Sequence, residues 1–422
     1  MKRIKFPNNF LWGSATSAHQ VEGGNLNSWS EWEKENAERL ARGAKNKYAR
    51  WQVNRFPKML KSENYISGRA CDHYNCYEED FDIAKKLNHN AHRFSIEWSR
   101  IEPEEGKFDE KEIEHYRKVL QALRERGIEP FVTLRHWTNP IWLADDDGEL
   151  NKKFAFYFAR YARFVVEQLG DLVGFWITLN EPTSVIVNSY TQGVWPPQKR
   201  NLLSVLKVYK NLARAHNYAY NEIHKISPKA KIGFANVLTF FEVYDKNLVL
   251  DKITVKIAKY FGNKKFLNLT KDRHDFLTAQ YYFHNRLKFP GKIKNENKKV
   301  SDLGWEIYPK GIYHILKDLQ KYNLPIYITE NGLADADDTN REKFIKEHLY
   351  WIDKAMQEGV NVQGYFYWSL LDNFEWDKGF WPRFGLVEVN FETMKRKIRE
   401  SAIEYAKICK EGKFSIDEND LL

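Results

Sequence analysis

The chain has 422 residues, of which 43% are hydrophobic and 29% charged, so it is long enough to bury a large core. Its net charge of +9 comes from 66 Lys and Arg spread among 57 Asp and Glu, and nucleic acid is therefore not expected as a partner. Cys71, Cys76 and Cys409 form neither a metal-binding pair nor a disulfide framework.

No apolar stretch approaches the roughly 20 residues of a membrane span, and the N-terminus lacks an apolar signal segment. We therefore expect a cytoplasmic protein. Abundant Lys and Glu with only three Cys and four Met are also typical of heat-adapted proteins, so we expect heat stability.

Short runs rich in apolar, β-branched or aromatic residues recur along the whole chain, as expected for strands. There are eight: 9–18, 89–98, 129–136, 174–182, 231–240, 275–283, 325–332 and 361–370. Between them lie stretches with helical spacing, of which those from Glu114, Phe154 and Phe344 each end at or near a Gly, as helices often do.

Strand followed by helix, eight times, predicts an α/β fold of the (β/α)₈ TIM-barrel type. The alternative is a doubly wound open sheet. That fold usually carries a Gly-rich first turn, and neither GxGxxG nor a Walker A motif occurs here. No linker or repeat interrupts the chain, so we expect residues 1–422 to form a single catalytic domain.

The stretch 248–261 has a basic amphipathic pattern, with Leu250, Ile253, Ile257 and Phe261 on one face. Such a helix either rests on a membrane surface or packs against its own barrel. The second interpretation is the more common one, and membrane contact has no other support in the sequence.

In barrel enzymes the reacting groups lie at the carboxyl ends of the strands. Polar or aromatic residues occupy these positions throughout: Gln20, Arg93, His136, Asn180, Glu181, Asn236, Tyr282, Glu330, Asn331, Trp368, Glu375 and Trp376. They include neither a phosphate-binding loop nor a metal-ligand set, so we expect no metal and no cofactor.

Two glutamates, Glu181 and Glu330, end otherwise apolar strands, and each has an Asn beside it. A single glutamate at such a position is more often structural. A pair is what glycoside hydrolysis requires, because one carboxyl must be protonated to assist the departing oxygen while the other is ionised.

The chain resembles glycoside hydrolase family 1, the family of β-glucosidases and β-galactosidases. The resemblance spans nearly the whole length and rests on six motifs in order: FPNNFLWGSATSAHQVEGG from Phe6, HRFSIEWSRI from His92, TLRHW from Thr133, TLNEP from Thr178, ITENG from Ile328 and GYFYWSLLDNFEW from Gly364. It implies a retaining β-glycosidase that cleaves terminal β-D-glycosides, most often glucosides and alternatively galactosides or alkyl glucosides.

The resemblance implies Glu330 as nucleophile and Glu181 as acid/base. Arg93 and Tyr282 would hold Glu330 ionised. The mechanism then predicts a raised pKa for Glu181, a depressed pKa for Glu330 and carboxyl groups about 5–5.5 Å apart. The resemblance also implies that sugar binding is the role of Gln20, His136, Asn180, Trp368, Glu375 and Trp376.

Two departures from the family pattern are notable. Gln280 stands where members usually have Asn, which puts a direct contact from this position in doubt. The stretch between Asn263 and Asp275 is short, which predicts an open aglycone side that accepts alkyl chains.

Three alternatives remain: an inactive sugar-binding relative, a 6-phosphoglycosidase and a metal-dependent barrel hydrolase. The presence of both glutamates disfavours the first, and Glu375, which would repel a phosphate, disfavours the second. His19, His92 and His136 are too isolated to require the third. The sequence does not give the oligomeric state or choose between glucose, galactose and fucose.

Overall fold

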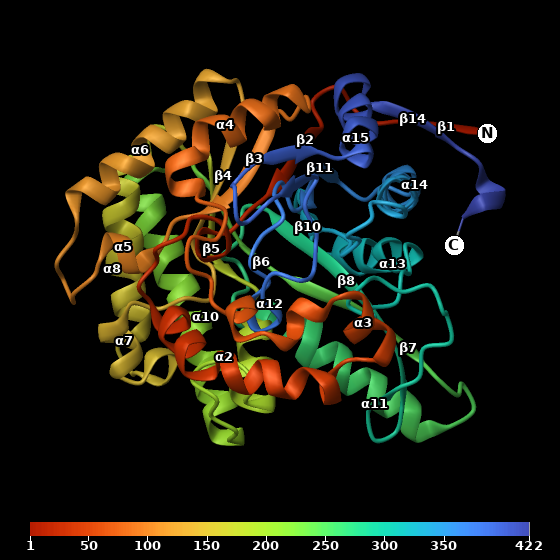
Figure 1. Ribbon diagram of the computed structural model, residues 1–422, viewed down its shortest axis with the longest axis horizontal. Coiled ribbons are helices and arrows are strands. Elements are labelled where there is room, and N and C mark those ends of the chain that lie inside the picture. The colour runs from red at the N-terminus through yellow and green to blue at the C-terminus, as the bar shows by residue number, and fades with distance from the viewer. Residues whose placement is uncertain (422) are drawn as a thin grey trace.

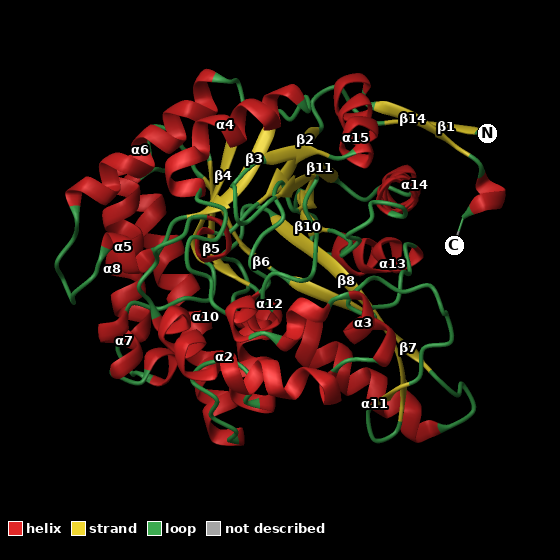
Figure 2. Ribbon diagram, viewed as in Figure 1, coloured by secondary structure: helices red, strands yellow, loops and turns green. Residues whose placement is uncertain are grey.

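The computed structural model describes residues 1–421, and it contains a closed barrel of parallel strands surrounded by helices (Figures 1 and 2). The eight predicted strands are all present, and the (β/α)₈ fold is confirmed. They are β2 (Leu11–Ala15), β3 (Ala91–Ser95), β4 (Glu129–Arg135), β5 (Phe175–Asn180), β6 (Lys231–Ala235), β8 (Leu277–Lys288), β10 (Ile326–Asn331) and β11 (Val362–Trp368).

The barrel closes through β6 and β7 (Val237–Val243), which are successive parts of one extended segment interrupted at Asn236. These two strands stand at opposite ends of the sheet order β6-β5-β4-β3-β2-β11-β10-β8-β7. Backbone hydrogen bonds from Asp275 N to Ile232 O (2.8 Å) and from Gln280 N to Asn236 O (2.9 Å) join the segment to β8. The run expected at 231–240 is therefore two short strands.

Helices cover the outside of the barrel, with α4, α6 and α8 on one side and α13, α14 and α15 on the other (Figure 1). The helices of the chain are α1 (Ala18–Val21), α2 (Ser28–Lys47), α3 (Arg50–Arg55), α4 (His73–Lys86), α5 (Trp98–Ile101), α6 (Glu110–Glu125), α7 (Ile141–Asp145), α8 (Phe154–Leu169), α9 (Pro182–Val185), α10 (Leu202–Ile226), α11 (Val249–Lys259), α12 (Lys265–Leu269), α13 (Lys310–Gln320), α14 (Arg341–Gln357) and α15 (Glu400–Glu411).

Local sequence sets the ends of these helices. The Asp109 side chain accepts hydrogen bonds from the backbone N–H groups of Lys111 (2.8 Å) and Glu112 (3.3 Å), so α6 begins four residues before the predicted Glu114. Gly127 and Gly359 follow α6 and α14 with φ of +67° and +85°, a conformation that glycine adopts readily.

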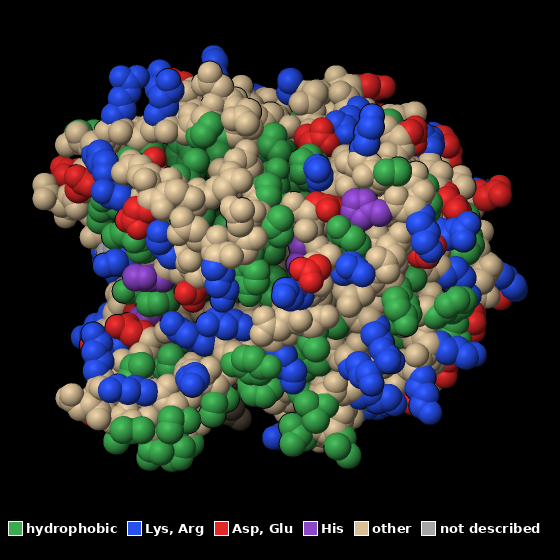
Figure 3. Space-filling model, turned by 180° about the vertical axis from the view of Figure 1, so that it is seen from behind, with side chains coloured by type: hydrophobic (Ala, Val, Ile, Leu, Met, Phe, Trp, Pro, Cys, Tyr) green, Lys and Arg blue, Asp and Glu red, His purple; other side chains and the backbone are tan. Residues whose placement is uncertain are grey.

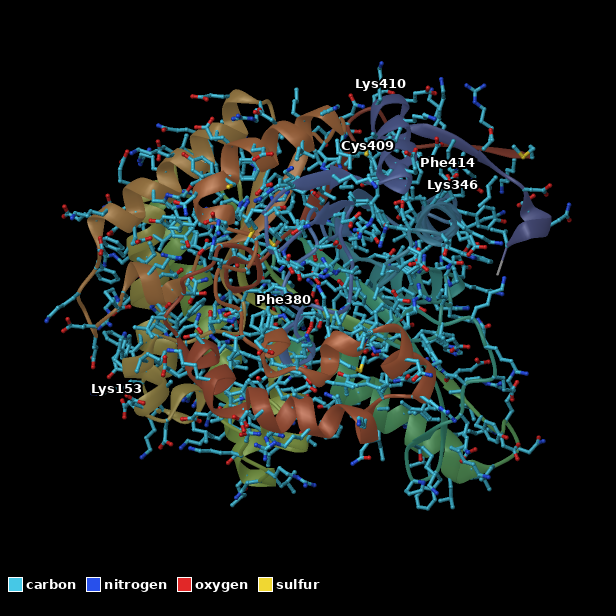
Figure 4. The ribbon with its side chains drawn as sticks, in the orientation of Figure 1. Lys153, Lys346, Phe380, Cys409, Lys410 and Phe414 are labelled. Atoms are coloured by element: carbon cyan, nitrogen blue, oxygen red, sulfur yellow. The ribbon has the colours of Figure 1, made fainter. Side chains whose placement is uncertain are left out.

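Smaller elements complete the fold. β1 (Lys2–Lys5) pairs antiparallel with β14 (Lys413–Ile416), which brings the two ends of the chain together. Figure 4 shows Cys409 and Phe414 in this region. β12 (Val387–Val389) pairs with β13 (Arg396–Ile398), and β9 (Lys292–Ile293) pairs with β8. None of the helices in residues 1–421 is long and apolar enough to cross a bilayer.

Aromatic rings fill the interior of the barrel. Phe131 of β4 stacks on Phe175 of β5 with ring centroids 4.1 Å apart and lies 4.8 Å from Phe366 of β11. Phe276 and Tyr327 complete the same buried cluster. Gly233 and Gly13 leave room for these rings, because a Cβ there would lie 2.9 Å from Phe276 and 3.3 Å from Phe366, respectively. The interior of the barrel is therefore closely packed.

Gly13 of β2 tests this packing, because a Cβ built there lies 2.0 Å from the backbone oxygen of Ala91. We expect Gly13→Ala to destabilise the fold by roughly 1–3 kcal/mol through overpacking. The matched control is Gly43→Ala in α2, where nothing lies within 4 Å. This change should stabilise the helix by about 0.5–1 kcal/mol. Thermal unfolding of both variants checks the prediction, and equal midpoints would contradict it.

Candidate active site

The carboxyl ends of the barrel strands surround a cavity of about 260 Å³. Eight of the ten predicted site residues line it: Gln20, His136, Glu181, Tyr282, Glu330, Trp368, Glu375 and Trp376. The other two, Arg93 and Asn180, are buried and contact the lining residues Glu330 and His136, respectively. Asn236 and Asn331 are also buried. The side-chain amide of Asn331 donates a hydrogen bond to the backbone oxygen of Tyr281 (2.7 Å), and this contact is structural.

Glu330 ends β10 and receives donors from both sides. Arg93, which is fully buried in β3, forms an ion pair with its Oε1, and the Tyr282 hydroxyl donates to its Oε2 at 2.8 Å. A guanidinium and a phenol both stabilise the charged form of a carboxylate. Burial raises the pKa of Tyr282 well above its usual range, so the phenol keeps its proton.

Asn180 is held by three neighbours. Its Oδ1 accepts hydrogen bonds from Arg93 Nη2 (2.6 Å) and Gln280 Nε2 (3.1 Å), which leaves its amide nitrogen 2.9 Å from His136 Nε2. Burial and the nearby Arg93 charge place the pKa of His136 far below its usual value, so the imidazole is neutral. Gln280 therefore acts on the site through Asn180.

Glu181 follows β5 in a left-handed conformation, with φ 39° and ψ 63°. This conformation costs a non-glycine residue on the order of 1–3 kcal/mol and is often found at functional sites. The backbone N–H of Glu181 donates to Ala235 O (2.9 Å), and the Ser184 hydroxyl donates to Glu181 Oε2 (2.7 Å). Trp137 and Trp376, which also line the cavity, have positive φ as well.

The surroundings of the two glutamates give them different acidities. Burial and the negative charge of Glu330 raise the pKa of Glu181 to about 8. Burial also raises the pKa of Glu330, although Arg93 and Tyr282 oppose it. The predicted depression of the Glu330 pKa is therefore wrong, because desolvation outweighs the two donors. Glu181 remains the weaker acid, since it faces a negative charge and Glu330 faces a positive one.

Gln20, Glu375 and Trp376 also line the cavity. The Gln20 amide donates to Glu375 Oε2 (3.3 Å) and to the backbone oxygen of Phe374 (2.8 Å). Burial raises the pKa of Glu375 to about 7 against the opposing charge of Lys378. Phe380 belongs to the same loop, and Figure 4 shows it near the middle of the molecule.

Several cavity residues were not predicted from the sequence. They are Trp137, Ser184, Asn188, Trp195, Phe283, Trp305, Lys378 and Phe384. Ser184 and Lys378 lie within three residues of Glu181 and Glu375, so their closeness in sequence to a candidate residue could have predicted them. Trp195 and Trp305 lie in long loops, and the sequence does not indicate which way a side chain in such a loop points. Within residues 1–421, no group of three or more His, Cys, Asp or Glu side chains is placed to hold a metal ion.

Comparison with protein families identifies this constellation. The model of glycosyl hydrolase family 1 matches residues 2–271 and 264–414, which together span almost the whole chain. The chain belongs to glycosyl hydrolase family 1. It is therefore a glycoside hydrolase, and the predicted family and enzyme class are confirmed.

Individual members of glycosyl hydrolase family 1 are similar to this chain over nearly their full length. The chain is 35% identical to a β-glucosidase A of Thermotoga maritima, covering 96% of this chain and 98% of the relative. Among solved structures, a β-glycosidase from Pyrococcus horikoshii superposes with a TM-score of 0.86 at 35% identity, covering 98% and 97% of the two chains. A 6-phospho-β-galactosidase of Staphylococcus haemolyticus is 30% identical, covering 96% of this chain and 98% of the relative.

The acidity of Glu181 can be measured directly. In carbon NMR of protein labelled at glutamate carboxyls, we expect one site-cavity carboxyl to titrate near pH 8. Glu330→Gln removes the charge that raises this pKa and should move the titration to lower pH, whereas Glu181→Gln should abolish it. A Glu181 titration near the ordinary value of about 4.3 would contradict the prediction.

Proposed function

We propose that this member of glycosyl hydrolase family 1 hydrolyses non-reducing terminal β-D-glucosides, with retention of configuration, through a covalent glycosyl-enzyme. The observation that carries the proposal is the pair Glu181 and Glu330. Both are buried in one cavity, and Glu181 holds its proton up to about pH 8 while Glu330 is ion-paired with Arg93. The relatives named β-glucosidase support glucose as the sugar.

Glu330 is the proposed nucleophile. Its carboxylate oxygen bonds to the anomeric carbon as the bond from that carbon to the aglycone oxygen breaks. Arg93 and Tyr282 donate to the two oxygens of the ionised carboxylate before attack. These contacts keep the attacking group charged and fix its orientation.

Glu181 is the proposed acid and then base. It gives its proton to the departing aglycone oxygen in the first step. In the second step it takes a proton from the water that attacks the anomeric carbon, and the ester to Glu330 breaks. A pKa of about 8 suits this role, because the group is protonated at neutral pH and ionises once the negative charge of Glu330 is consumed.

Sugar recognition is assigned to the remaining lining residues. The neutral imidazole of His136, the oriented amide of Asn180 and the Gln20 and Glu375 pair supply donors and acceptors for hydroxyl groups. Trp368 and Trp376 supply flat apolar faces for the C–H side of the ring. All of them are buried except Glu375, which is partly buried, so the site holds one sugar largely out of water.

We further propose that the substrate carries no phosphate on its sugar. Glu375 presents a carboxyl to the cavity, and a 6-phosphate would bring a second negative charge against it. The short stretch before Asp275 supports an open aglycone side that accepts alkyl chains. A single catalytic domain over residues 1–422, a cytoplasmic location and heat stability stay predictions.

We expect p-nitrophenyl β-glucoside to be cleaved with β-glucose appearing first in proton NMR, before mutarotation. The 6-phosphorylated substrate should be cleaved roughly 100-fold less efficiently, because it places like charges together. In Glu375→Gln this ratio should shrink, since the amide removes the repulsion. Initial release of α-glucose would contradict retention. Equal cleavage of both substrates by the wild type would contradict the assignment of Glu375.

A further inference from the structure

Two helices at one end of the molecule expose apolar side chains. On α10, Leu202 and Leu203 are 75% and 76% exposed, and Leu206 is exposed beside them. On α11 and the turn that follows it, the exposed residues are Val249, Leu250, Ile253, Ile257, Tyr260 and Phe261. We call these nine side chains the apolar edge. Figure 3 shows two apolar lobes along the lower border, where Figure 1 has α11 and the start of α10.

The helix α11 is turned with its apolar face outward. Leu250, Ile253, Ile257 and Phe261, which the sequence more commonly predicts to pack on the barrel, are all exposed. The side facing the protein contains Asp251, whose carboxylate accepts from the backbone N–H groups of Phe289 (2.8 Å) and Asp245 (3.1 Å). Because these contacts fix the helix orientation, packing against the barrel does not account for its apolar face.

The two parts of the apolar edge are joined to each other. The Tyr209 hydroxyl of α10 donates to the backbone oxygen of Phe261 at 2.9 Å. The Lys265 ammonium lies over the rings of both residues, at 4.4 and 4.6 Å. The edge is therefore one surface built from two segments that are distant in sequence.

The two segments that carry the apolar edge are rich in Lys and Arg, although exposed Asp245 and Asp272 border the second and Asp147 pairs with Lys199 of the first. Residues 182–221 contain five Lys and Arg and no Asp or Glu. Residues 246–271 contain seven Lys and a single acid, the buried Asp251. Lys210, Lys252 and Lys256 are exposed and have no ion-pair partner among the described residues. This combination of apolar and basic side chains fits an anionic lipid surface.

From this surface we infer that the apolar edge docks the protein on an anionic lipid bilayer. The apolar side chains enter the boundary of the acyl region, and the surrounding Lys and Arg contact the lipid phosphates. A second copy of the chain is a poorer occupant, because a symmetric contact would place the same cationic surface against itself. A lipid surface supplies the opposite charge.

The docking surface and the cavity are connected by one segment of the chain. Ser184, Asn188 and Trp195 line the cavity, and the same segment then leads into α10 at Leu202. Resting on the proposed function, docking through this surface would bring the enzyme to membranes, where glycosides with long alkyl aglycones gather. The docking itself does not depend on that function.

Sedimentation with vesicles tests the inference on the full chain. We expect the protein to bind vesicles of phosphatidylglycerol mixed with phosphatidylcholine at least 10-fold more tightly than vesicles of phosphatidylcholine alone. Raising the salt concentration should weaken this binding. The double variant Leu203→Glu with Ile253→Glu should lose at least 10-fold in affinity for the anionic vesicles.

The matched control is Ile403→Glu, which places a new charge at an exposed apolar position on α15, outside the apolar edge. It should bind anionic vesicles as the wild type does. Unchanged cleavage of p-nitrophenyl β-glucoside shows that the variants are folded, and it separates a failure of docking from a failure of the proposed function.

Two outcomes would overturn the inference. One is the absence of binding to anionic vesicles. The other is a concentration-dependent dimer in light scattering that Leu203→Glu with Ile253→Glu abolishes, because the apolar edge would then be an interface between two copies.

Discussion

Arg93 is a fully buried cation, and the arrangement of the site depends on what neutralises it. Its guanidinium pairs with Glu330, donates to Asn180 Oδ1 at 2.6 Å, and bonds Thr133 Oγ1 at 3.1 Å through Nε. A buried charge without such partners would cost several kcal/mol. The side chains of β3, β4, β5 and β10 are therefore held in one mutual geometry, and Asn180 passes this geometry on to His136.

The barrel is what makes such a burial tolerable. The rings of Phe131, Phe175 and Phe366 close the interior below the site, and Trp368 and Trp376 line the cavity above it. The low polarity that raises the pKa of Glu181 to about 8 also strengthens the contact between Arg93 and Glu330. The low polarity of the site thus keeps Glu181 protonated and Glu330 paired with Arg93.

Much of the fold was predictable, because each barrel strand carries its own apolar signal. All eight strands were located, and eight of the twelve candidates from the strand-end rule line one cavity. The balance of opposing effects on the pKa of Glu330 was not predictable. The Glu330 pKa depends on how far desolvation exceeds the help of Arg93 and Tyr282, and a sequence does not give that difference.

Relations between distant segments were also missed. The charge count of the whole chain suggested an evenly mixed surface, yet two segments rich in Lys and Arg come together beside the apolar edge through Tyr209 and Lys265. The departure at Gln280 suggested only a lost contact, whereas its amide bonds Asn180 at 3.1 Å. In both cases the sequence contained the residues, and only the fold supplied their neighbours.

The most direct test of the central claim is the stereochemistry of azide products from two variants of the glutamate pair. In Glu330→Ala, hydrolysis of p-nitrophenyl β-glucoside should fall by on the order of 10⁴-fold or more, and azide should restore turnover and give α-glucosyl azide. In Glu181→Ala, azide should intercept the glycosyl-enzyme and give β-glucosyl azide. Exchanged products, or near-normal activity of Glu330→Ala, would contradict the assignment of the two roles.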